Sequence, residues 1–460
     1  MSTTKKVLIG IFSTLGALLL IAYLIPVLTS LDAFYPGTYI NGKDYSFKSP
    51  MYADEDMYVS PSDYTITVKF RDGDFDIKGQ DIGLAISYKD QLYGIKAEQN
   101  PFAWPAHIGK HDYTIEKKIS YDEKLLDKVL TECDFMKDEN MTDPDEPLIM
   151  LSDEGTAYVN EGSMGNRILN KKAIYDAVDD AIMNLTGEVD VESLNCYKEP
   201  RYKADSKVIQ DCLDYYNKKL AMDITYKMGN VEKTLTKIQL FGFLAHTDAY
   251  KPYIDKNKVG VFVRVFAFNN DTVGKNRTFT THNHNTIEVT SSKYGWAIDQ
   301  EIEAQQLYDE LMIGRDVYRE PNLLSSGFTL NEDGDDIGEF YAEVDISAQH
   351  VFVYKYGKCI FDSDCVTGNT SLGRGTPGGL YYIYYKQSPA ILKGEDYENP
   401  VAYWMPFNGG IGFHDATWRG VFGGTIYQYG GSHGCVNLPY SKAQELFGIV
   451  QEGMPVVCYY

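Results

Sequence analysis

A thiol and two imidazoles lie close together in the sequence between residues 414 and 435. His414 is followed, after 17 residues, by the run Ser-His-Gly-Cys-Val-Asn, in which the second imidazole is His433 and the thiol is Cys435. A thiol attacks a carbonyl group only as the thiolate, so it needs a nearby base or positive field to lower its pKa from about 8.5. Either histidine is a candidate for that base. The spacing therefore predicts acyl chemistry at Cys435.

Gly434 adds a second chemical feature to this run. A residue without a Cβ atom can adopt a positive φ, which would leave the thiol and the N–H of Cys435 facing a cleft. The adjacent N–H groups of Gly434 and Cys435 would then face a developing oxyanion. The alternative is structural, because an isolated cysteine is more often a small buried hydrophobe and a lone histidine usually a hydrogen-bonded structural residue.

The whole pattern resembles the signature of the L,D-transpeptidases, cysteine enzymes that cross-link bacterial peptidoglycan. The similarity extends upstream to about residue 339. Residues 341–354 predict two strands around a turn, and Thr-Pro-Gly-Gly at 376–379 is similar to a family segment that leads into a strand, here 382–386. One departure concerns Gly431 and Asn437, since many relatives carry arginine at both places. The resemblance therefore leaves open which groups hold the substrate's carboxylates.

The resemblance implies a role for each residue of the site. His414 would deprotonate Cys435, with the backbone around Asp415 or a neighbouring carbonyl orienting the imidazole. His433 would contact the oxyanion or the substrate, and it is also the alternative base. Candidates for binding substrate or lining the cleft are Ser432, Asn437, Trp418, Tyr384 and Trp404. The two polar candidates have structural alternatives, in holding and ending the loop, and aromatic residues at such spacings are more often core.

The resemblance also implies the reaction. Cys435 would attack the carbonyl before the terminal D-alanine of a tetrapeptide stem and release D-alanine, leaving a thioester. An amine of a second stem would resolve the thioester as a 3→3 cross-link, whereas water would make the same site an L,D-carboxypeptidase. No cofactor or metal is needed. The partners would be peptidoglycan stem peptides, as donor tetrapeptide and as acceptor amine.

Two other functions would use the same residues. A cysteine peptidase or amidase of wall peptides shares the thiol and the imidazole, but the familiar wall-peptidase families place cysteine before histidine, and here His414 precedes Cys435. A membrane-tethered wall-binding protein with an inactive catalytic domain would need no activated thiol. The complete motif favours the enzyme.

The N-terminal region predicts a membrane-spanning helix. Residues 7–28 contain no charged side chain, and a helix of that length spans roughly 33 Å, enough for the core of a bilayer. Lys5 and Lys6 precede this run and Asp32 follows it, which places the tail 1–6 in the cytoplasm and the rest outside. The run is longer than most signal-peptide cores and no small-residue cleavage site follows it, so we expect an uncleaved anchor rather than an export signal. The protein would be a single-pass protein of the cell membrane with its catalytic domain facing the cell wall.

The charge and the cysteines fit an exported protein. The formal charge is −22 at pH 7, which argues against a sequence-independent attraction to nucleic acid or to anionic lipid. Seven cysteines are present, and six remain for disulfides if Cys435 is the nucleophile, although no spacing identifies a pairing. Cys458 lies in an apolar run and is expected in a buried strand.

The length of 460 residues is enough for about three domains. We expect a multidomain fold with the transmembrane helix, two α+β modules and a mostly-β catalytic domain built as a mixed β-sandwich or barrel. The predicted boundaries are 34–200 for the first module, 201–321 for the second, 322–338 for a linker and 339–460 for the catalytic domain. Within the first module, residues 34–45 predict a hairpin, 64–70 a strand, and 121–136 and 171–185 helices.

An internal repeat indicates that the two modules are related. Residues 165–169, a helix with Tyr-Asp at 175–176 and Tyr-Lys-Glu-Pro at 197–200 recur as 295–299, Tyr-Asp at 308–309 and Tyr-Arg-Glu-Pro at 318–321. The arrangement resembles the peptidoglycan-binding modules that precede some L,D-transpeptidase domains, and a plain spacer is the alternative. His282 and His284 would lie on one face of a strand as metal ligands, but no third ligand is near in sequence, so a polar loop is expected.

Overall fold

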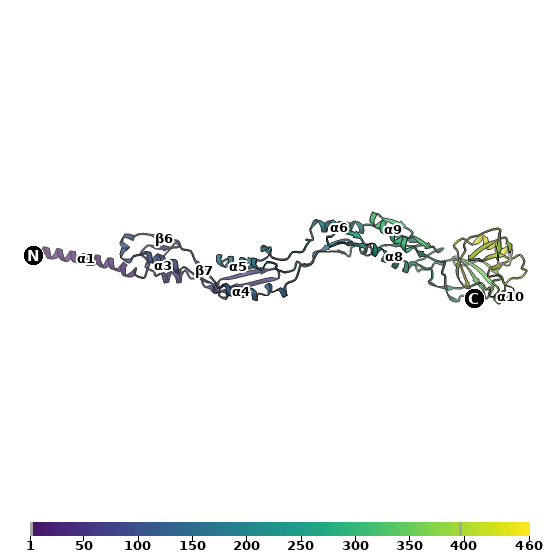
Figure 1. Ribbon diagram of the computed structural model, residues 1–460, viewed down its shortest axis with the longest axis horizontal. Helices are drawn as coiled ribbons and strands as arrows, with labels where there is room; N and C mark the ends of the chain where they lie inside the picture. Colours follow the sequence, from purple (N-terminus) through teal and green to yellow (C-terminus); the bar gives the residue numbers. More distant parts are fainter. Residues whose placement is uncertain (1–2, 395–397) are drawn as a thin grey trace. The chain divides into compact units, whose positions relative to one another are not determined.

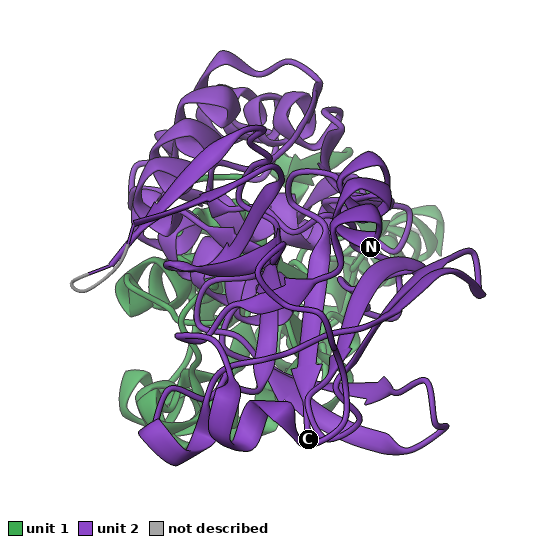
Figure 2. Cartoon of the chain, turned by 90° about the vertical axis from the view of Figure 1, so that its right-hand side faces the viewer, with its two compact units in different colours: residues 1–148, 161–203 green, residues 149–160, 204–460 purple. Residues whose placement is uncertain are grey.

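The computed structural model describes residues 3–394 and 398–460 (Figure 1). The chain divides into two compact units, one of residues 1–148 with 161–203 and one of residues 149–160 with 204–460 (Figure 2). The second module and residues 339–460, the predicted catalytic domain, fall in the same unit. The order of elements agrees with the predicted fold class, an apolar N-terminal helix followed by helix-and-strand modules and a strand-rich region.

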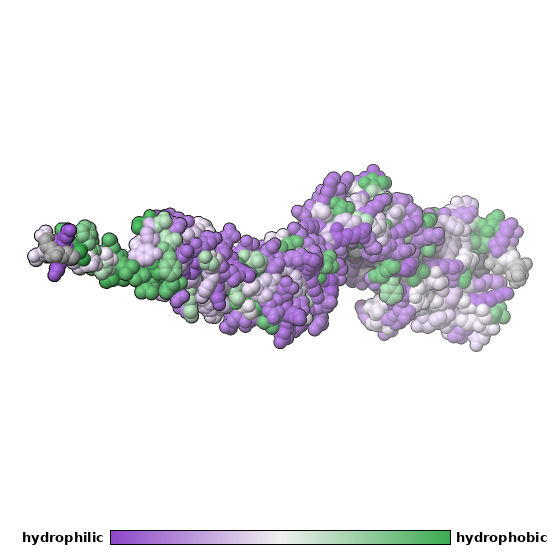
Figure 3. Space-filling view, turned by 60° about the vertical axis from the view of Figure 1, so that its left-hand side comes forward, coloured by the Kyte–Doolittle hydropathy of each residue, from purple (hydrophilic) through white to green (hydrophobic). Residues whose placement is uncertain are grey.

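Helix α1 (Thr3–Thr29) is the apolar N-terminal segment. Among the described residues it is the helix whose length and composition suffice to cross a membrane, with a mean hydropathy of 2.4 and none of its apolar window buried. Its hydrophobic side chains are visible at the surface in Figure 3. The end of the helix contacts residues 101–107, because the Tyr23 hydroxyl donates to Phe102 O (2.9 Å) and Trp104 Nε1 donates to Tyr23 O (3.1 Å).

The first unit contains two separate hydrophobic cores. The smaller one is built on Phe34, Ile40, Tyr45 and Leu92. It is formed by β1 (Thr38–Ile40), β2 (Lys43–Asp44), α2 (Pro50–Asp56), α3 (Lys89–Glu98) and β6 (His111–Tyr113). Strands β1 and β2 pair antiparallel, which confirms the predicted hairpin.

The larger core of the first unit follows the alternation and helical spacing seen in the sequence. Ile66, Val68 and Phe70 are buried on one face of β3 (Thr65–Phe70). Apolar residues three and four apart are buried on the two helices of this core, α4 (Glu123–Glu132) and α5 (Lys171–Asn184). The remaining elements are β4 (Gly73–Lys78), β5 (Ala85–Ser87), β7 (Lys118–Ser120) and β10 (Glu188–Asp190). The predicted strand and both predicted helices are confirmed.

The second module occupies the first part of the other unit. Its elements are α6 (Lys207–Leu220), β11 (Ile224–Met228), β12 (Val231–Thr234), α7 (Lys237–Phe243), β13 (Leu244–His246), β14 (Pro252–Ile254), α8 (Lys256–Asn270), β15 (Asn276–Thr280), β16 (Thr286–Thr290), β17 (Ala297–Ile298), α9 (Gln300–Ile313), β18 (Val317–Arg319) and β19 (Leu323–Ser325). The hairpin of β8 (Leu148–Leu151) and β9 (Ala157–Asn160) also packs here. The Asn217 side chain on α6 bonds both the N–H and the carbonyl of Ala157 (2.7 and 3.1 Å).

The two modules contain the same three-stranded sheet, in which a hairpin (β3–β4 or β11–β12) is joined by a parallel strand (β10 or β18) that follows α5 or α9. The sequence repeat is therefore confirmed from the helix to that strand. The prediction for the last segment of the repeat is wrong. Tyr318 lies in β18, whereas Tyr197 lies beyond β10 and pairs with Ile168. The counterpart of Tyr197 is Leu323, which pairs with Ile298, because the four-residue match falls at a different point of the fold in each module.

The predicted catalytic domain, residues 339–460, is built on two mixed sheets. Five strands pair in the order β22-β21-β20-β29-β23, and three in the order β26-β27-β28. Their bounds are β20 (Phe340–Asp345), β21 (His350–Lys355), β22 (Lys358–Asp364), β23 (Gly379–Tyr382), β26 (Trp404–Asn408), β27 (Ile411–Asp415), β28 (Val436–Leu438) and β29 (Pro455–Tyr459). The hairpin β24 (Ala390–Lys393) with β25 (Glu398–Val401), helix α10 (Ile426–Gly430) and helix α11 (Tyr440–Ile449) complete it.

Two sequence predictions about these strands have different outcomes. The hairpin predicted for 341–354 is confirmed as β20–β21. The strand predicted for 382–386 is displaced, since β23 covers Gly379–Tyr382. The reason is its partner, because β23 pairs antiparallel with β29 and the pairing stops where β29 begins, at Pro455. Cys458 lies buried in β29 as predicted, and all seven cysteines are free.

The hairpin β15–β16 of the second module shares a hydrophobic core with the catalytic domain. Phe279 and Val289 from the hairpin pack with Leu380, Val457 and Tyr459 from β23 and β29. The core is continuous across the two regions, which explains why they form one compact unit.

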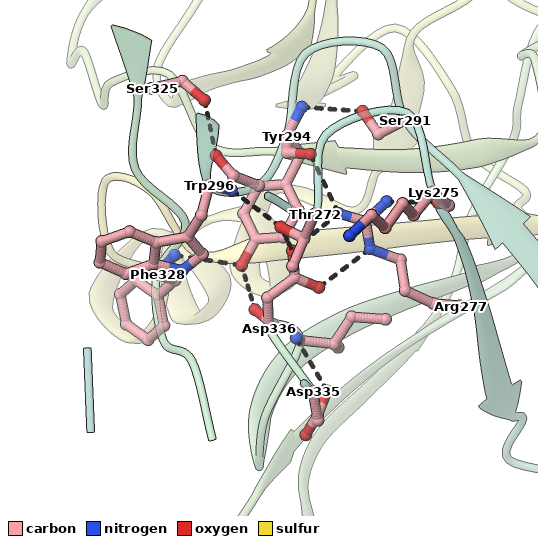
Figure 4. A network of polar contacts seen from close by, with 12 residues as sticks. Thr272, Lys275, Arg277, Ser291, Tyr294, Trp296, Ser325, Phe328, Asp335 and Asp336 are labelled. Atoms are coloured by element: carbon pink, nitrogen blue, oxygen red, sulfur yellow. Dashed lines mark hydrogen bonds and ion pairs between the residues drawn. The ribbon is translucent and has the colours of Figure 1, made fainter. Parts of the chain in front are cut away.

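A buried ion pair lies beside this core. Arg277 contacts Asp336 through two hydrogen bonds (2.9 and 2.7 Å), and both side chains are almost fully buried (Figure 4). Thr272 Oγ1 donates to the same carboxylate (2.6 Å), and the Tyr294 hydroxyl donates to Asp336 O (2.5 Å). Residues 322–338, predicted as a linker, are thus held by the second module through side-chain and backbone contacts.

The pair His282 and His284 lies in the loop between β15 and β16. The His282 ring stacks on Phe352 with centroids 3.8 Å apart, and its Nδ1 lies 2.6 Å from the Tyr354 hydroxyl oxygen. His284 has a positive φ of 62°. The predicted polar loop is confirmed, and among the residues that the structure describes no three metal-binding side chains come together.

Candidate active site

A cavity of about 230 Å³ in the catalytic domain brings most of the predicted site residues together. The side chains that line it include His414, Trp418, Arg419, Ser432, His433, Cys435 and Asn437. Tyr384 is not among them, because it lines a different cavity beside Thr290 and Tyr382, where its hydroxyl accepts from Gly409 N (3.2 Å). Trp404 is buried behind the site.

Adjacent parallel strands position the imidazole and the thiol. His414 lies near the end of β27 and pairs in register with Asn437 on β28. Cys435, just before β28, therefore lies level with Gly412, two residues before His414 on the neighbouring strand. Every residue of β28 is buried, which leaves the strand no alternative register that would keep its apolar side chains covered.

The His414 ring is held in one tautomer. Its Nδ1 lies 2.8 Å from Asp415 O, and a carbonyl oxygen only accepts, so Nδ1 carries the proton and Nε2 has a free lone pair. Burial lowers the pKa of His414, with the backbone bond to Asp415 opposing the shift. The rings of Trp404 and Trp418 lie 5.9 and 6.0 Å from the imidazole centroid. His414 is therefore a neutral, oriented acceptor at neutral pH.

Asp415 acts through two different groups. Its backbone carbonyl accepts a hydrogen bond from His414 Nδ1–H. Its side chain accepts from the N–H groups of Ala402 (2.7 Å) and Tyr403 (2.9 Å). The carboxylate thus ties β27 to the segment that follows β25. The predicted backbone contact of Asp415 is present in the structure.

The Cys435 thiol is buried and protonated rather than ionised. It is 7% exposed, packs with Ala390, Val401 and Trp404, and its Sγ lies 3.5 Å from Gly410 O. Burial raises the pKa of Cys435 to about 11, although a backbone contact with Gly412 opposes the rise. The lowered pKa expected from sequence is not found, because desolvation outweighs the neighbouring dipoles.

Internal hydrogen bonds hold the loop that carries Cys435. Ser432 Oγ donates to Cys435 O (2.5 Å) and accepts from Gly434 N (3.0 Å), as predicted for a loop-holding residue. Gly434 has a φ of 126°, the positive value expected from the sequence. Its N–H, however, is already engaged by Ser432. Thr376 Oγ1 donates to Gly434 O (2.6 Å) and accepts from Gly368 N (3.0 Å), which ties the loop to the Thr-Pro-Gly-Gly segment.

Two family profiles match the chain. One, YkuD, described as the L,D-transpeptidase catalytic domain, matches residues 339–458. The other, described as "Putative peptidoglycan binding domain", matches residues 205–317. No curated protein matches the chain.

Solved structures extend the match over more of the chain. Ldtfm, in the structure of its carbamoyl enzyme with avibactam, is 31% identical over 55% of this chain and 99% of its own, with a TM-score of 0.47. The chain belongs to the L,D-transpeptidase family. A cysteine-to-serine mutant of an Enterococcus faecium L,D-transpeptidase is 30% identical over 54% of this chain and 100% of its own (TM-score 0.46). The catalytic domain of the E. faecium enzyme acylated by ertapenem is 42% identical over 26% and 97% (TM-score 0.25).

The family assignment confirms the resemblance drawn from the Ser-His-Gly-Cys run and makes the chain an enzyme of the acyltransferase class. The structure also explains why a glycine, Gly431, precedes the run in this L,D-transpeptidase. A Cβ atom at Gly431 would lie 2.5 Å from Asn369 N and 2.7 Å from Gly368 C, so the close approach of that backbone excludes any side chain here. The arginine that many members of the family carry at this position therefore does not fit here.

Sequence analysis missed several lining residues of the L,D-transpeptidase cleft. Arg419, which lines the cavity, lies five residues after His414. Arg374 does not line the cavity itself, but its Nη1 contacts His433 Nε2, which does. Leu392 and Asn399 come from the hairpin β24–β25. Arg419 stands inside the gap between His414 and Cys435, and a basic residue at that place was the one available signal. The others reach the site only through tertiary pairing.

Proposed function

We propose that this L,D-transpeptidase forms 3→3 cross-links in peptidoglycan through a thioester on Cys435. The observation that carries the proposal is the bond from His414 Nδ1 to Asp415 O, which leaves Nε2 unprotonated in the same cavity as the thiol. A base of this kind accepts a proton at neutral pH without first losing one.

The first half of the reaction forms the acyl enzyme. His414 Nε2 takes the Cys435 proton as the sulfur attacks the carbonyl carbon that precedes the terminal D-alanine of a tetrapeptide stem. The tetrahedral oxyanion is stabilised by the N–H of Cys435 and by a contact from His433, and the Gly434 N–H joins only if it leaves Ser432. The C–N bond then breaks, the leaving nitrogen takes the proton from the imidazolium, and D-alanine departs.

The second half of the reaction transfers the acyl group. A neutral amine from a neighbouring stem attacks the thioester carbon and gives its proton to His414 Nε2. The C–S bond breaks and the sulfur leaves as the thiol after recovering that proton, so the enzyme returns to its starting state. Water in place of the amine gives hydrolysis, the L,D-carboxypeptidase reaction of the same site.

The rest of the chain supports a wall-facing arrangement in this proposal. The helix α1 has the length and composition of a membrane span, and the match of residues 205–317 supports contact between the second module and peptidoglycan. We propose the boundaries 34–200, 201–321, 322–338 and 339–460 for the two modules, the connecting segment and the catalytic domain. The protein would be a single-pass membrane protein with the catalytic domain outside.

Mass spectrometry of the intact full-length chain with a carbapenem tests the nucleophile. We expect one adduct per chain, lost in Cys435→Ala and retained in Cys359→Ala, which removes an exposed free thiol as the matched control. The acyl-accepting chain is then incubated with tetrapeptide muropeptides, where D-alanine release and a 3→3 dimer are expected. A folded wild-type chain that forms no adduct, or an adduct that moves to another cysteine, would contradict the assignment of Cys435.

A further inference from the structure

Arg419 places a half-buried guanidinium in the wall of the cavity that holds the thiol. Its Nη1 donates to Gly430 O (2.7 Å), at the end of the short helix α10. Its Nε is buried and has no hydrogen-bond partner in the part of the chain that the structure describes. The side chain is therefore anchored through Nη1, and no described residue accepts from Nε.

The positive charge of Arg419 also lacks a counter-charge among the described residues. Other buried arginines have one, since Arg277 pairs with Asp336 and Arg319 with Glu303. Burial lowers the pKa of Arg419, and no neighbouring carboxylate among the described residues opposes the shift. The positive charge of Arg419 also repels a proton on His414 and so disfavours the imidazolium. An unpaired cation beside reacting groups is unfavourable in the free enzyme unless a ligand supplies the anion.

We infer that Arg419 binds the C-terminal carboxylate of the donor stem and so selects donors that end one residue beyond the attacked carbonyl. This inference rests on the proposed function. The carboxylate accepts from the terminal guanidinium nitrogens, through the hydrogens that Gly430 does not occupy, and planar guanidinium and carboxylate groups match each other's geometry. Arg419 is thus a specificity-determining residue that takes no part in proton transfer.

The size of the donor's terminal residue explains how one cation can select stem length. Successive residues of a peptide are about 3.8 Å apart, and Arg419 and Cys435 line one small cavity, so a donor with its carboxylate at Arg419 and its attacked carbon at Cys435 ends close to that carbon. A stem with one more residue would place a neutral amide against Arg419 and its carboxylate beyond it. Once D-alanine has left, the guanidinium also disfavours a protonated acceptor and favours the neutral amine that can attack.

Two donors that differ only in the terminal group test the inference. Tetrapeptides that end in D-alanine or in D-alaninamide are given to the full-length chain, and release of the terminal residue is followed by mass spectrometry. We expect the wild type to prefer the acid by about tenfold or more in kcat/KM, the value of one charge-assisted hydrogen bond. In Arg419→Gln the ratio should fall close to one, mainly through a higher KM for the acid, and Arg419→Lys should keep part of it.

The ratio separates recognition from a structural role. If Arg419 only holds Gly430, its replacement slows both donors equally, the ratio stays at its wild-type value, and the inference fails. The same holds if Arg374→Gln rather than Arg419→Gln abolishes the preference, because Arg374 is the other cation near the loop. Arg315→Gln, an exposed position in the second module, is the matched control and should change neither donor.

Binding to a chain that cannot react keeps the inference independent of turnover. In Cys435→Ala, calorimetry should show tighter binding of the acid than of the amide, and adding Arg419→Gln should remove the difference. Discrimination in binding without release of D-alanine by the wild type would overturn the proposed function and leave the role of Arg419 intact. Equal binding of the two donors would overturn the role of Arg419.

Discussion

His414 and Cys435 are both buried, and burial moves their pKa values in opposite directions. Burial raises the pKa of the thiol to about 11 and lowers the pKa of the imidazole from its usual value, so the proton stays on sulfur in the free enzyme. An ion pair at rest would require the reverse order of the two pKa values. In the proposed mechanism, proton transfer is therefore coupled to attack on the substrate, and the reaction depends on stabilisation of the oxyanion.

The pH dependence of acylation follows from this order. In the proposed mechanism only neutral His414 acts as a base, and because burial lowers its pKa, the neutral form persists below about pH 6.5. We expect the second-order rate of carbapenem acylation to fall on the acid side with a midpoint below that value and to be flat through neutral pH. The rate is measured by mass spectrometry between about pH 5 and pH 8.

The controls for this profile are substitutions of the base. His414→Gln should remove the acid limb and lower the rate by about 100-fold or more. His433→Gln should keep the limb if His414 is the base. A limb that follows His433 instead, or a rate that keeps rising toward the pKa of the thiol, would contradict the assignment.

The residues of the Cys435 loop could be proposed from sequence because they are neighbours along the chain. Ser432, Gly434 and Cys435 lie in one run, and their loop geometry follows from local residue types. Arg419 could not be assigned a role, since its position beside the thiol depends on the loop after β27. Tyr384 was placed in the site on residue type alone, and aromatic side chains fill cores as readily as clefts.

At the scale of elements, the Cys435 loop depends on one buried hydroxyl. Thr376→Val keeps the shape of the side chain but leaves Gly368 N–H and Gly434 O without their partner, so we expect a stability loss of about 1–3 kcal/mol. Acylation of Cys435 should slow as well. Thr376→Ser restores the hydroxyl and should recover most of both, as measured by denaturant unfolding and by carbapenem mass spectrometry. Equal behaviour of the valine and serine variants would contradict this role.

The junction between the second module and the catalytic domain depends on a buried charge. Asp336→Ala leaves Arg277 without a counter-charge, and we expect the unit to lose about 3–5 kcal/mol of stability. Denaturant midpoints of the full-length chain measure the change. Asp211→Ala, which breaks an exposed pair with Lys207, is the control and should have no measurable effect. A midpoint for Asp336→Ala within error of the wild type would show that the pair is dispensable.

Periodicity predicted individual helices and strands well, and pairing partners less well. The strand 64–70 and the helix 171–185 were found because alternation and helical spacing are local. The strand after Thr-Pro-Gly-Gly was displaced because its end is set by β29, about 75 residues away in sequence. The Tyr-Arg-Glu-Pro repeat was misaligned for a related reason, since one short motif falls at two different structural positions.

At the scale of the whole molecule, retention or cleavage of the N-terminal helix decides whether the enzyme stays on the membrane. We expect α1 to remain on the chain as an anchor. Intact mass of the protein from a producing bacterium should equal the uncleaved chain, and the protein should stay with membranes after alkaline carbonate extraction. Added protease should remove the catalytic domain from intact spheroplasts. A shorter soluble form beginning beyond the helix would show an export signal instead.

The place of β29 in the catalytic sheet has a consequence for biosynthesis. This strand is the last of the domain to be synthesised, yet it lies between β20 and β23 and bridges them. The ribosome must pass residue 459 before the two halves of the sheet can join, and until then the segments that carry the imidazole and the thiol lack a common support. A nonsense codon within β29 would therefore remove the strand that joins the two halves of the sheet, and we expect it to abolish the enzyme rather than shorten it.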